Sequence, residues 1–326
     1  MPPDQMISET SPAAGMKDAA EFYRRGRLVE AERIYRSILA RQPDHFEARR
    51  QLGVVLYWNR DFVEAERELR HALGLNPKSE DAHLDHSAVL RSLLRFEDSL
   101  GASEKAVALR PDSVPALYRR GIALMDLMRN DEALASFDAV LAIDPNHAEA
   151  INDRGITLGQ MNRMEEAILH YDRAIALNPQ YAHAFNNRGV ALCAVGRFEE
   201  ALASYAKVLA IEPAYGEALY NRGIALVALK HANEARLRSE ETSAQANTRL
   251  LLDALADFDR AIALRPDLAD AFNNRGAVLS ELGRNDEALE SYDRALALRP
   301  DFAEAQAGRA RCNLGLARSD APSIRL

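Results

Sequence analysis

Two neighbouring histidines are the side chains in this sequence that most resemble a metal site. His83 and His86 are three residues apart, with Asp81 and Asp85 beside them. On a helix, side chains at this spacing share one face. Imidazole and carboxylate both bind zinc, but a tight site needs further ligands at fixed spacing. We therefore expect buried or half-buried packing histidines, and the sequence predicts no bound metal and no cofactor.

No other arrangement of residues indicates catalysis. Asp, His and Ser are scattered along the chain, without a nucleophile elbow or a glycine-rich phosphate loop. Paired acids such as Glu165 with Glu166, and Glu199 with Glu200, stand where a helix is expected to begin. Negative charge is favourable at that end of a helix. We expect a protein that is not an enzyme.

Composition narrows the class of partner and the compartment. The 326 residues carry a net charge of -8, which disfavours binding to a phosphate backbone. Cys193 and Cys312 stand far apart without CxxC spacing, so neither a disulfide framework nor a thiolate metal site is indicated. No apolar run has the length of a signal peptide or of a membrane span. These features predict a soluble, cytoplasmic protein that does not bind nucleic acid.

Regularly spaced prolines reveal the elements that hold these side chains. The first six are each 34 residues apart, and the last two are again 34 apart. A fixed period of this length predicts one supersecondary unit stacked many times. Within residues 269–300, apolar residues recur at i, i+4 and i+7 in two runs separated by a polar break. Each unit is therefore expected to hold two amphipathic helices, with the proline ending the second. The prolines are Pro43, Pro77, Pro111, Pro145, Pro179, Pro213, Pro266 and Pro300.

The residues shared by these blocks resemble the tetratricopeptide repeat. Gly or Ala stands at the eighth place, Ala at the twentieth, an aromatic residue at the twenty-fourth, Ala at the twenty-seventh and Pro at the thirty-second. The resemblance implies an all-α fold, namely a right-handed α-α superhelical solenoid of about eight helix pairs with a C-terminal capping helix. We expect a disordered N-terminus at 1–11, a solenoid over 12–318 and a loose tail at 319–326. The expected units are 12–45, 46–79, 80–113, 114–147, 148–181, 182–215, 216–268 and 269–302, followed by the cap helix at 303–318.

One interval between prolines breaks the period. Pro213 and Pro266 are 53 residues apart, which places 19 extra residues at about 231–251, between the two helices of the seventh unit. The segment contains neither Gly nor Pro, so a helical conformation is compatible with it. Nineteen residues would turn a single helix about 100° off its packed face. We expect a less ordered, projecting excursion, with the second helix beginning near Asn247 or Arg249. A tolerated loop and a partner-contacting element both remain open.

Arginine recurs at the seventh place, which is usually apolar. Aspartate recurs at the twenty-fifth place, and a half-buried cation needs a partner. Our hypothesis is a structural row of ion pairs between helices or repeats; the alternative is that the arginines open into a groove and contact a ligand. The residues are Arg120, Arg154, Arg188, Arg222 and Arg275, with Asp138, Asp172, Asp259 and Asp293.

The fifth and sixth places are the candidate binding positions. In arrays of this family the first helix of each unit lines the inner surface, and here the later units are rich in asparagine at these places. A carboxamide both donates and accepts, so a row of them can hold a peptide backbone whatever its side chains. The row resembles the asparagine ladder in the repeat region of O-linked N-acetylglucosamine transferases. The candidate groove residues are Tyr118, Arg119, Asn152, Asp153, Asn186, Asn187, Tyr220, Asn221, Asn273 and Asn274.

The ninth place argues against one binding mode of the family. Clamps for chaperone tails carry Asn there, whereas this chain carries apolar residues, so an extended or helical peptide segment suits the lining better. The ninth-place residues are Val54, Ala88, Ile122, Ile156, Val190, Ile224 and Ala277.

The resemblance therefore implies a scaffold or adaptor that binds a protein or peptide partner. An alternative is an accessory, substrate-recruiting arm for a glycosyltransferase acting in trans, because the NNRG and YDRALALRP phrases resemble bacterial proteins in which such repeats precede a transferase domain. The partner's identity, the pathway and self-association stay open.

Overall fold

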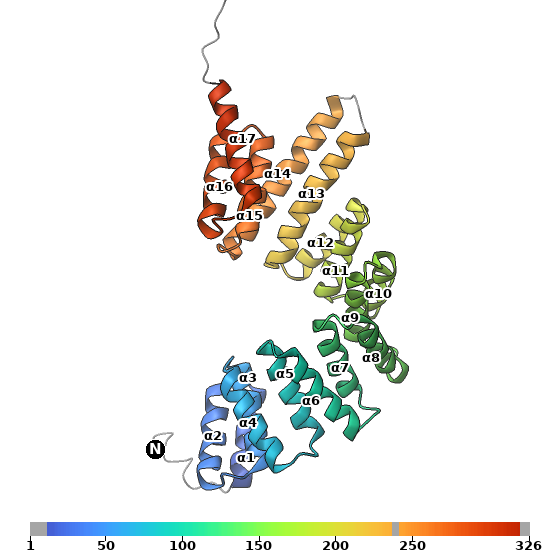
Figure 1. Ribbon diagram of the computed structural model, residues 1–326, viewed down its shortest axis with the longest axis vertical. Helices are drawn as coiled ribbons and strands as arrows, with labels where there is room; N and C mark the ends of the chain where they lie inside the picture. Colours follow the sequence, from blue (N-terminus) through green and yellow to red (C-terminus); the bar gives the residue numbers. More distant parts are fainter. Residues whose placement is uncertain (1–11, 237–240, 320–326) are drawn as a thin grey trace, which may run out of the picture. The chain divides into compact units, whose positions relative to one another are not determined.

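The computed structural model describes residues 12–236 and 241–319, and in these residues the secondary structure is entirely helical. The segment predicted to be disordered, 1–11, lies outside the described residues. So does the predicted tail 319–326, except for Ser319, which is the last residue of a helix. Short turns join helices that run antiparallel in pairs (Figure 1). The predicted all-α solenoid of helix pairs is therefore confirmed.

The chain divides into two compact parts, called the first unit (Met1–Met161) and the second unit (Asn162–Leu326). Each unit holds several of the helix pairs, which are called repeats. The helices of the first unit are α1 (Pro12–Arg24), α2 (Leu28–Arg41), α3 (Phe46–Trp58), α4 (Phe62–Leu75), α5 (Glu80–Ser92), α6 (Phe96–Leu109), α7 (Val114–Asp126), α8 (Asn130–Ile143) and α9 (Ala148–Gln160). Those of the second unit are α10 (Met164–Leu177), α11 (Ala182–Ala194), α12 (Phe198–Ile211), α13 (Gly216–Arg236), α14 (Glu241–Leu264), α15 (Ala269–Glu281), α16 (Asn285–Leu298) and α17 (Ala303–Ser319).

A glycine on the first helix of a pair packs under an aromatic ring of the second. A Cβ built at Gly189 would lie 2.6 Å from Tyr205 Cε1, and one at Gly121 would lie 2.6 Å from Phe137 Cε1. Both rings are buried. The glycine therefore lets the two helices approach closely enough to bury the ring, which offsets its cost of roughly 1 kcal/mol in helix propensity.

The turn inside a helix pair holds a left-handed residue in every repeat except the seventh, where the link between α13 and α14 lies outside the described residues. At the fifteenth place of these repeats, φ is positive even where the residue is not glycine, as at Leu94 (58°) and Met128 (58°). In other repeats glycine fills the place, as at Gly196 (77°). The second helix ends two residues before the repeating proline; α12, for example, ends at Ile211 and Pro213 follows. Proline thus ends the second helix, as predicted.

The insertion differs from its prediction. The second helix of the seventh repeat, residues 216–268, begins at Glu241, which is earlier than Asn247 or Arg249. The extra residues lengthen both α13 and α14 (Figure 1). Asn247, Leu251 and Leu255 are all buried, at intervals of four residues along α14. This spacing keeps one face of the lengthened helix packed. We expected the extra residues to rotate one continuous helix off its packed face. They are instead shared between the end of α13 and the start of α14.

Candidate functional site

Three of the five seventh-place arginines bind aspartates of the preceding repeat. Arg188 Nε on α11 lies 2.6 Å from Asp172 Oδ1 on α10, and Arg188 Nη1 donates to Ser204 Oγ of its own repeat at 2.8 Å. The arginine side chain is 20% exposed. Arginines paired in this way link two repeats, which supports the structural interpretation over ligand contact for them. The same pairing joins Arg154 to Asp138 at 2.7 Å and Arg275 to Asp259 at 2.6 Å.

Two arginines take other partners, and the row continues into the capping helix. Arg120 Nε donates to Ser136 Oγ of its own repeat at 2.9 Å. The sixth repeat carries Ala206 in place of the aspartate. Arg222 accordingly turns to Asp257 of its own repeat at 2.6 Å, and Asp257 is only 2% exposed. In the capping helix, Arg309 pairs with Asp293 at 3.0 Å. Sequence reasoning missed Arg309, although its separation of sixteen residues from the aspartate matches the other pairs.

Fifth-place residues bond to sixth-place residues of the next repeat. In the first unit, the Tyr118 hydroxyl donates to Asp153 Oδ2 at 2.6 Å. In the second unit, Asn221 Nδ2 donates to Asn186 Oδ1 at 3.3 Å. These bonds join successive first helices, so the candidate residues form a polar row that fixes the register between repeats. The other pairs are Arg50 with Asp85 at 2.7 Å and Asn274 with Tyr220 at 3.2 Å.

Three of the candidate residues are buried inside this row. Asn152, Asp153 and Asn186 are 3%, 8% and 2% exposed. Asn152 donates to Asp153 Oδ1 at 3.0 Å, and Asn186 donates to Glu217 Oε1 at 3.0 Å. Burial raises the pKa of Asp153, although hydrogen bonds from Tyr118 and Asn152 oppose the rise. Asp153 and Asn186 thus bond to neighbouring repeats, while Asn152 holds the Asp153 carboxylate within its own repeat.

The remaining candidates in the second unit present amides next to apolar side chains. Asn221 and Asn274 are half-buried, on α13 and α15. Ile224 lies one helical turn after Asn221 and is 38% exposed. On α11, Asn187 is half-buried and Val190, one turn later, is 46% exposed. Residues three apart share a helix face, so each of these helices offers an amide and an apolar contact side by side. Tyr220 and Asn273 are half-buried as well.

A small pocket opens between α13 and α15 at this face. Its volume is about 230 Å³, and Asn274, His231 and Glu281 contribute its polar groups. Glu281 is neutralised by Lys230, whose Nζ lies 2.6 Å from Glu281 Oε2. Sequence reasoning used the ninth place only to exclude a carboxylate clamp and so missed this pocket; the signal was the apolar residue one turn after each amide. The apolar lining is Ile224, Val227, Ala228, Phe258, Ala277 and Val278.

Comparison with known proteins identifies the repeat. Family models described as "Tetratricopeptide repeat" match residues 22–85, 84–148 and 269–302, and one described as "TPR repeat" matches 158–196 and 191–230. The chain belongs to the tetratricopeptide repeat family. Membership supports a role as a protein-interaction scaffold. None of the curated proteins matches this tetratricopeptide repeat protein by sequence.

Solved structures share its fold at low identity. A chain of the APC/C hetero-tetramer Cut9–Hcn1 has a TM-score of 0.65 at 13% identity, covering 94% of this chain and 56% of that one. A tetratricopeptide repeat protein from Parabacteroides merdae has a TM-score of 0.58 at 15% identity, covering 82% and 98%. Pseudomonas aeruginosa pilF has a TM-score of 0.59 at 18% identity, covering 71% and 97%. The tetratricopeptide repeat protein thus spans about half of the first of these chains.

The two histidines of this tetratricopeptide repeat protein lie on α5. His83 is 6% exposed and His86 is half-buried, as their register predicts. Within residues 12–236 and 241–319, no group of three or more His, Cys, Asp or Glu side chains is placed to hold a metal ion. In the same residues, no helix combines the length and apolar character needed to cross a membrane.

Proposed function

We propose that this protein is a non-enzymatic adaptor that binds a peptide segment of a partner along the first helices of its second unit. The observation that carries the proposal is the apolar pocket between α13 and α15, which opens beside Asn274 and Ile224. Convergent polar groups at the edge of an apolar pocket are typical of a binding site.

The amides supply contacts that do not depend on the partner's sequence. Asn221 and Asn274 each donate one hydrogen bond through Nδ2 to a first-helix residue of the preceding repeat. A carboxamide has two donor hydrogens and two acceptor lone pairs, so bonding capacity remains at both residues. A peptide backbone crossing α13 and α15 would use this capacity, with Asn187 on α11 as a further contact.

The pocket supplies sequence preference. A volume of about 230 Å³ with an apolar lining suits one aliphatic or aromatic side chain of the partner. Burying such a side chain contributes about 1.5–3 kcal/mol. The partner peptide therefore carries an apolar anchor, and its backbone bonds to the neighbouring asparagines.

The other candidates receive narrower roles. Asn152, Asp153 and Asn186 are buried, so we propose that they position the first helices and do not touch the peptide. Tyr118 and Arg119 are half-buried on α7 and are proposed contacts of the first unit taken by itself. The Tyr118 hydroxyl already donates to Asp153, so its ring is the part offered to a ligand.

Affinity capture with a triple variant tests the amides. Wild-type protein and a variant with Asn187→Ala, Asn221→Ala and Asn274→Ala are used to capture partners from a lysate of the source cells, and the captured proteins are quantified by mass spectrometry. Partners held through the amides should fall at least severalfold with the variant. Capture that is unchanged in a folded triple variant, as judged by circular dichroism, would remove the amides from the proposal.

A further inference from the structure

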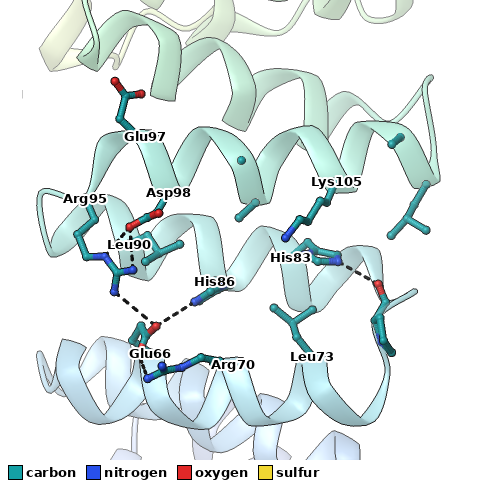
Figure 2. A pocket seen from close by; sticks show the side chains of 15 residues that line it. Glu66, Arg70, Leu73, His83, His86, Leu90, Arg95, Glu97, Asp98 and Lys105 are labelled. Atoms are coloured by element: carbon teal, nitrogen blue, oxygen red, sulfur yellow. Dashed lines mark hydrogen bonds and ion pairs between the residues drawn. The ribbon is translucent and has the colours of Figure 1, made fainter.

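A second, larger pocket lies in the first unit. It has a volume of about 750 Å³ and is formed by α4, α5 and α6, with both histidines of α5 among its walls (Figure 2). Ligand-binding pockets commonly have volumes of about 300–1,000 Å³. None of the candidate residues at the fifth and sixth places lines it. It is therefore separate from the proposed peptide site.

The pocket forms where the third repeat departs from the pattern of the others. Three serines stand at recurring places of the pattern. Ser87 stands where the other repeats have glycine or alanine, and Ser99 where they have alanine. Ser103 stands where they have an aromatic ring or, in the second repeat, Leu69. Ser87 Oγ bonds to Ser99 Oγ at 2.9 Å, so small polar side chains replace the buried ring between α5 and α6. On the pocket side, α6 presents Gly101 and Ala102. These small residues leave the space that the pocket occupies.

The charge pattern between the second and third repeats also differs from the arginine–aspartate pairing of the later repeats. The seventh place holds His86, and the twenty-fifth place of the preceding repeat holds Arg70 in place of aspartate. Glu66 compensates, because Arg70 Nη2 donates to its Oε2 at 2.8 Å and Arg95 Nη1 lies 3.5 Å from its Oε1. Arg95 also pairs with Asp98 at 2.7 Å. Both arginines in the pocket wall therefore have carboxylate partners.

Lys105 is the cation in the pocket wall that lacks a carboxylate partner. Within the described residues, no carboxylate forms an ion pair with it. Figure 2 shows its side chain extending from α6 toward α5, and its charge adds to the effect of burial in lowering the pKa of His83. His83 Nε2 lies 3.0 Å from the Pro77 carbonyl oxygen. A carbonyl only accepts, so Nε2 carries the proton and the neutral ring leaves Nδ1 as an acceptor. Nδ1 is buried without a hydrogen-bond partner.

We propose that this pocket binds a carboxylate side chain of an acidic peptide, held between Lys105 and a protonated His83. Lys105 Nζ donates to the carboxylate, and His83 takes one proton from solvent at Nδ1, which then donates to the same group. Nε2 keeps its bond to Pro77. Leu73, Leu90 and Leu109, which line the pocket, contact apolar side chains that flank the acid. Because Nδ1 is buried, a lining side chain has to move to admit the ligand, and the exposed Lys105 is the side chain that moves in this proposal.

Proton uptake distinguishes this site from an ordinary basic patch. The charged and titratable groups that line the pocket with His83 are Glu66 and Arg70 of α4, His86 of α5, and Arg95, Glu97, Asp98 and Lys105 from the turn and α6. Burial and Lys105 lower the pKa of His83, so the empty site keeps it neutral near pH 7. An added carboxylate favours the imidazolium, so binding takes up a proton and tightens as pH falls.

Titration calorimetry on the full chain tests the proposal with defined peptides. The probe is acetyl-Leu-Glu-Leu-amide, and acetyl-Leu-Gln-Leu-amide is its uncharged control. We expect the glutamate peptide to bind more tightly at pH 6 than at pH 8, with proton uptake measured in buffers of different ionisation enthalpy. Lys105→Gln should weaken binding about tenfold or more, because a charge-assisted hydrogen bond is lost. The matched charge change Lys207→Gln, at an exposed position of the second unit, should leave affinity unchanged.

Two further results decide between explanations. His83→Gln retains a donor for the Pro77 carbonyl, so the variant should still bind the glutamate peptide but without proton uptake. The groove variant Ile224→Asp should bind it as wild type does. Equal affinity for the two peptides, no binding by the wild type at millimolar concentration, or equal loss with Lys105→Gln and Lys207→Gln would each overturn the proposal.

Discussion

Arg188 of one repeat and Asp172 of the repeat before it form an ion pair with Nε and Oδ1 2.6 Å apart. The pair joins two helix pairs that have no covalent connection other than the turn between α10 and α11. In a repeat array, stability depends on such interfaces between neighbouring units. The arginine row therefore contributes to the register in which successive first helices present their amides.

Removing the arginine of this pair should destabilise the second unit. Arg188→Ala deletes the bonds to Asp172 and Ser204, and we expect a loss of about 1–2 kcal/mol, because Asp172 is half exposed and solvent compensates part of the charge. Arg309→Ala should reduce the free energy of unfolding by less, because the Arg309 side chain is 47% exposed. Urea denaturation followed by circular dichroism measures both. An equal, negligible effect of the two substitutions would contradict a structural role for the row.

A methyl group at the helix crossing should be poorly tolerated. Gly189→Ala places Cβ 2.6 Å from the ring of buried Tyr205, and overpacking of this kind costs about 1–3 kcal/mol. Gly101→Ala is the control, because a Cβ there meets nothing within 4 Å and alanine is the better helix former. Thermal unfolding should show a lower midpoint for the first variant and an unchanged or higher one for the second. The reverse order would rule out close packing as the reason for the glycine.

Glycine should improve the turn of the third repeat. Leu94 has φ of 58° and is 74% exposed, so its side chain contributes little burial while its backbone is strained. A left-handed conformation costs an L-residue about 1–2 kcal/mol, so Leu94→Gly should stabilise the first unit by up to about 1 kcal/mol after the entropy of glycine is subtracted. Gly196→Ala, at φ of 77°, should have the opposite sign. Chemical denaturation gives both values, and a destabilised Leu94→Gly would show that the leucine makes a contact worth more than the strain.

Buried histidine should make the first unit sensitive to acid. Burial lowers the pKa of His86, although Glu66 opposes the shift. The folded-state pKa therefore lies below the unfolded value of about 6.5, and the unfolded chain binds the extra proton. The stabilisation from neutral His86 is present above pH 6.5 and is lost as pH falls below it. Denaturation midpoints of wild type and His86→Gln between pH 5 and 8 should diverge on the acid side. Parallel curves would contradict the assignment.

The repeat register could be read from the sequence because it depends on local rules. Proline cannot continue a helix beyond its first turn, and apolar periodicity places Tyr205 and Gly189 on facing helices. The type of partner for Arg188 was predictable, but its choice of the preceding repeat was not, because that depends on how helix pairs stack. The same limit applies to Asn186, which is buried where it bonds to the next repeat. The pocket at Lys105 results from several small residues acting together, and no single one of them signals it.

The central claim is that a peptide binds along the first helices of the second unit with an apolar anchor between α13 and α15. The direct measurement is the affinity of peptides selected on wild-type protein from a random display library. Ile224→Asp places a charge in the 230 Å³ pocket, while Leu169→Asp makes the same change at a position 67% exposed on α10. We expect at least tenfold weaker binding for Ile224→Asp and unchanged binding for Leu169→Asp. Equal affinities of the two variants would contradict this claim.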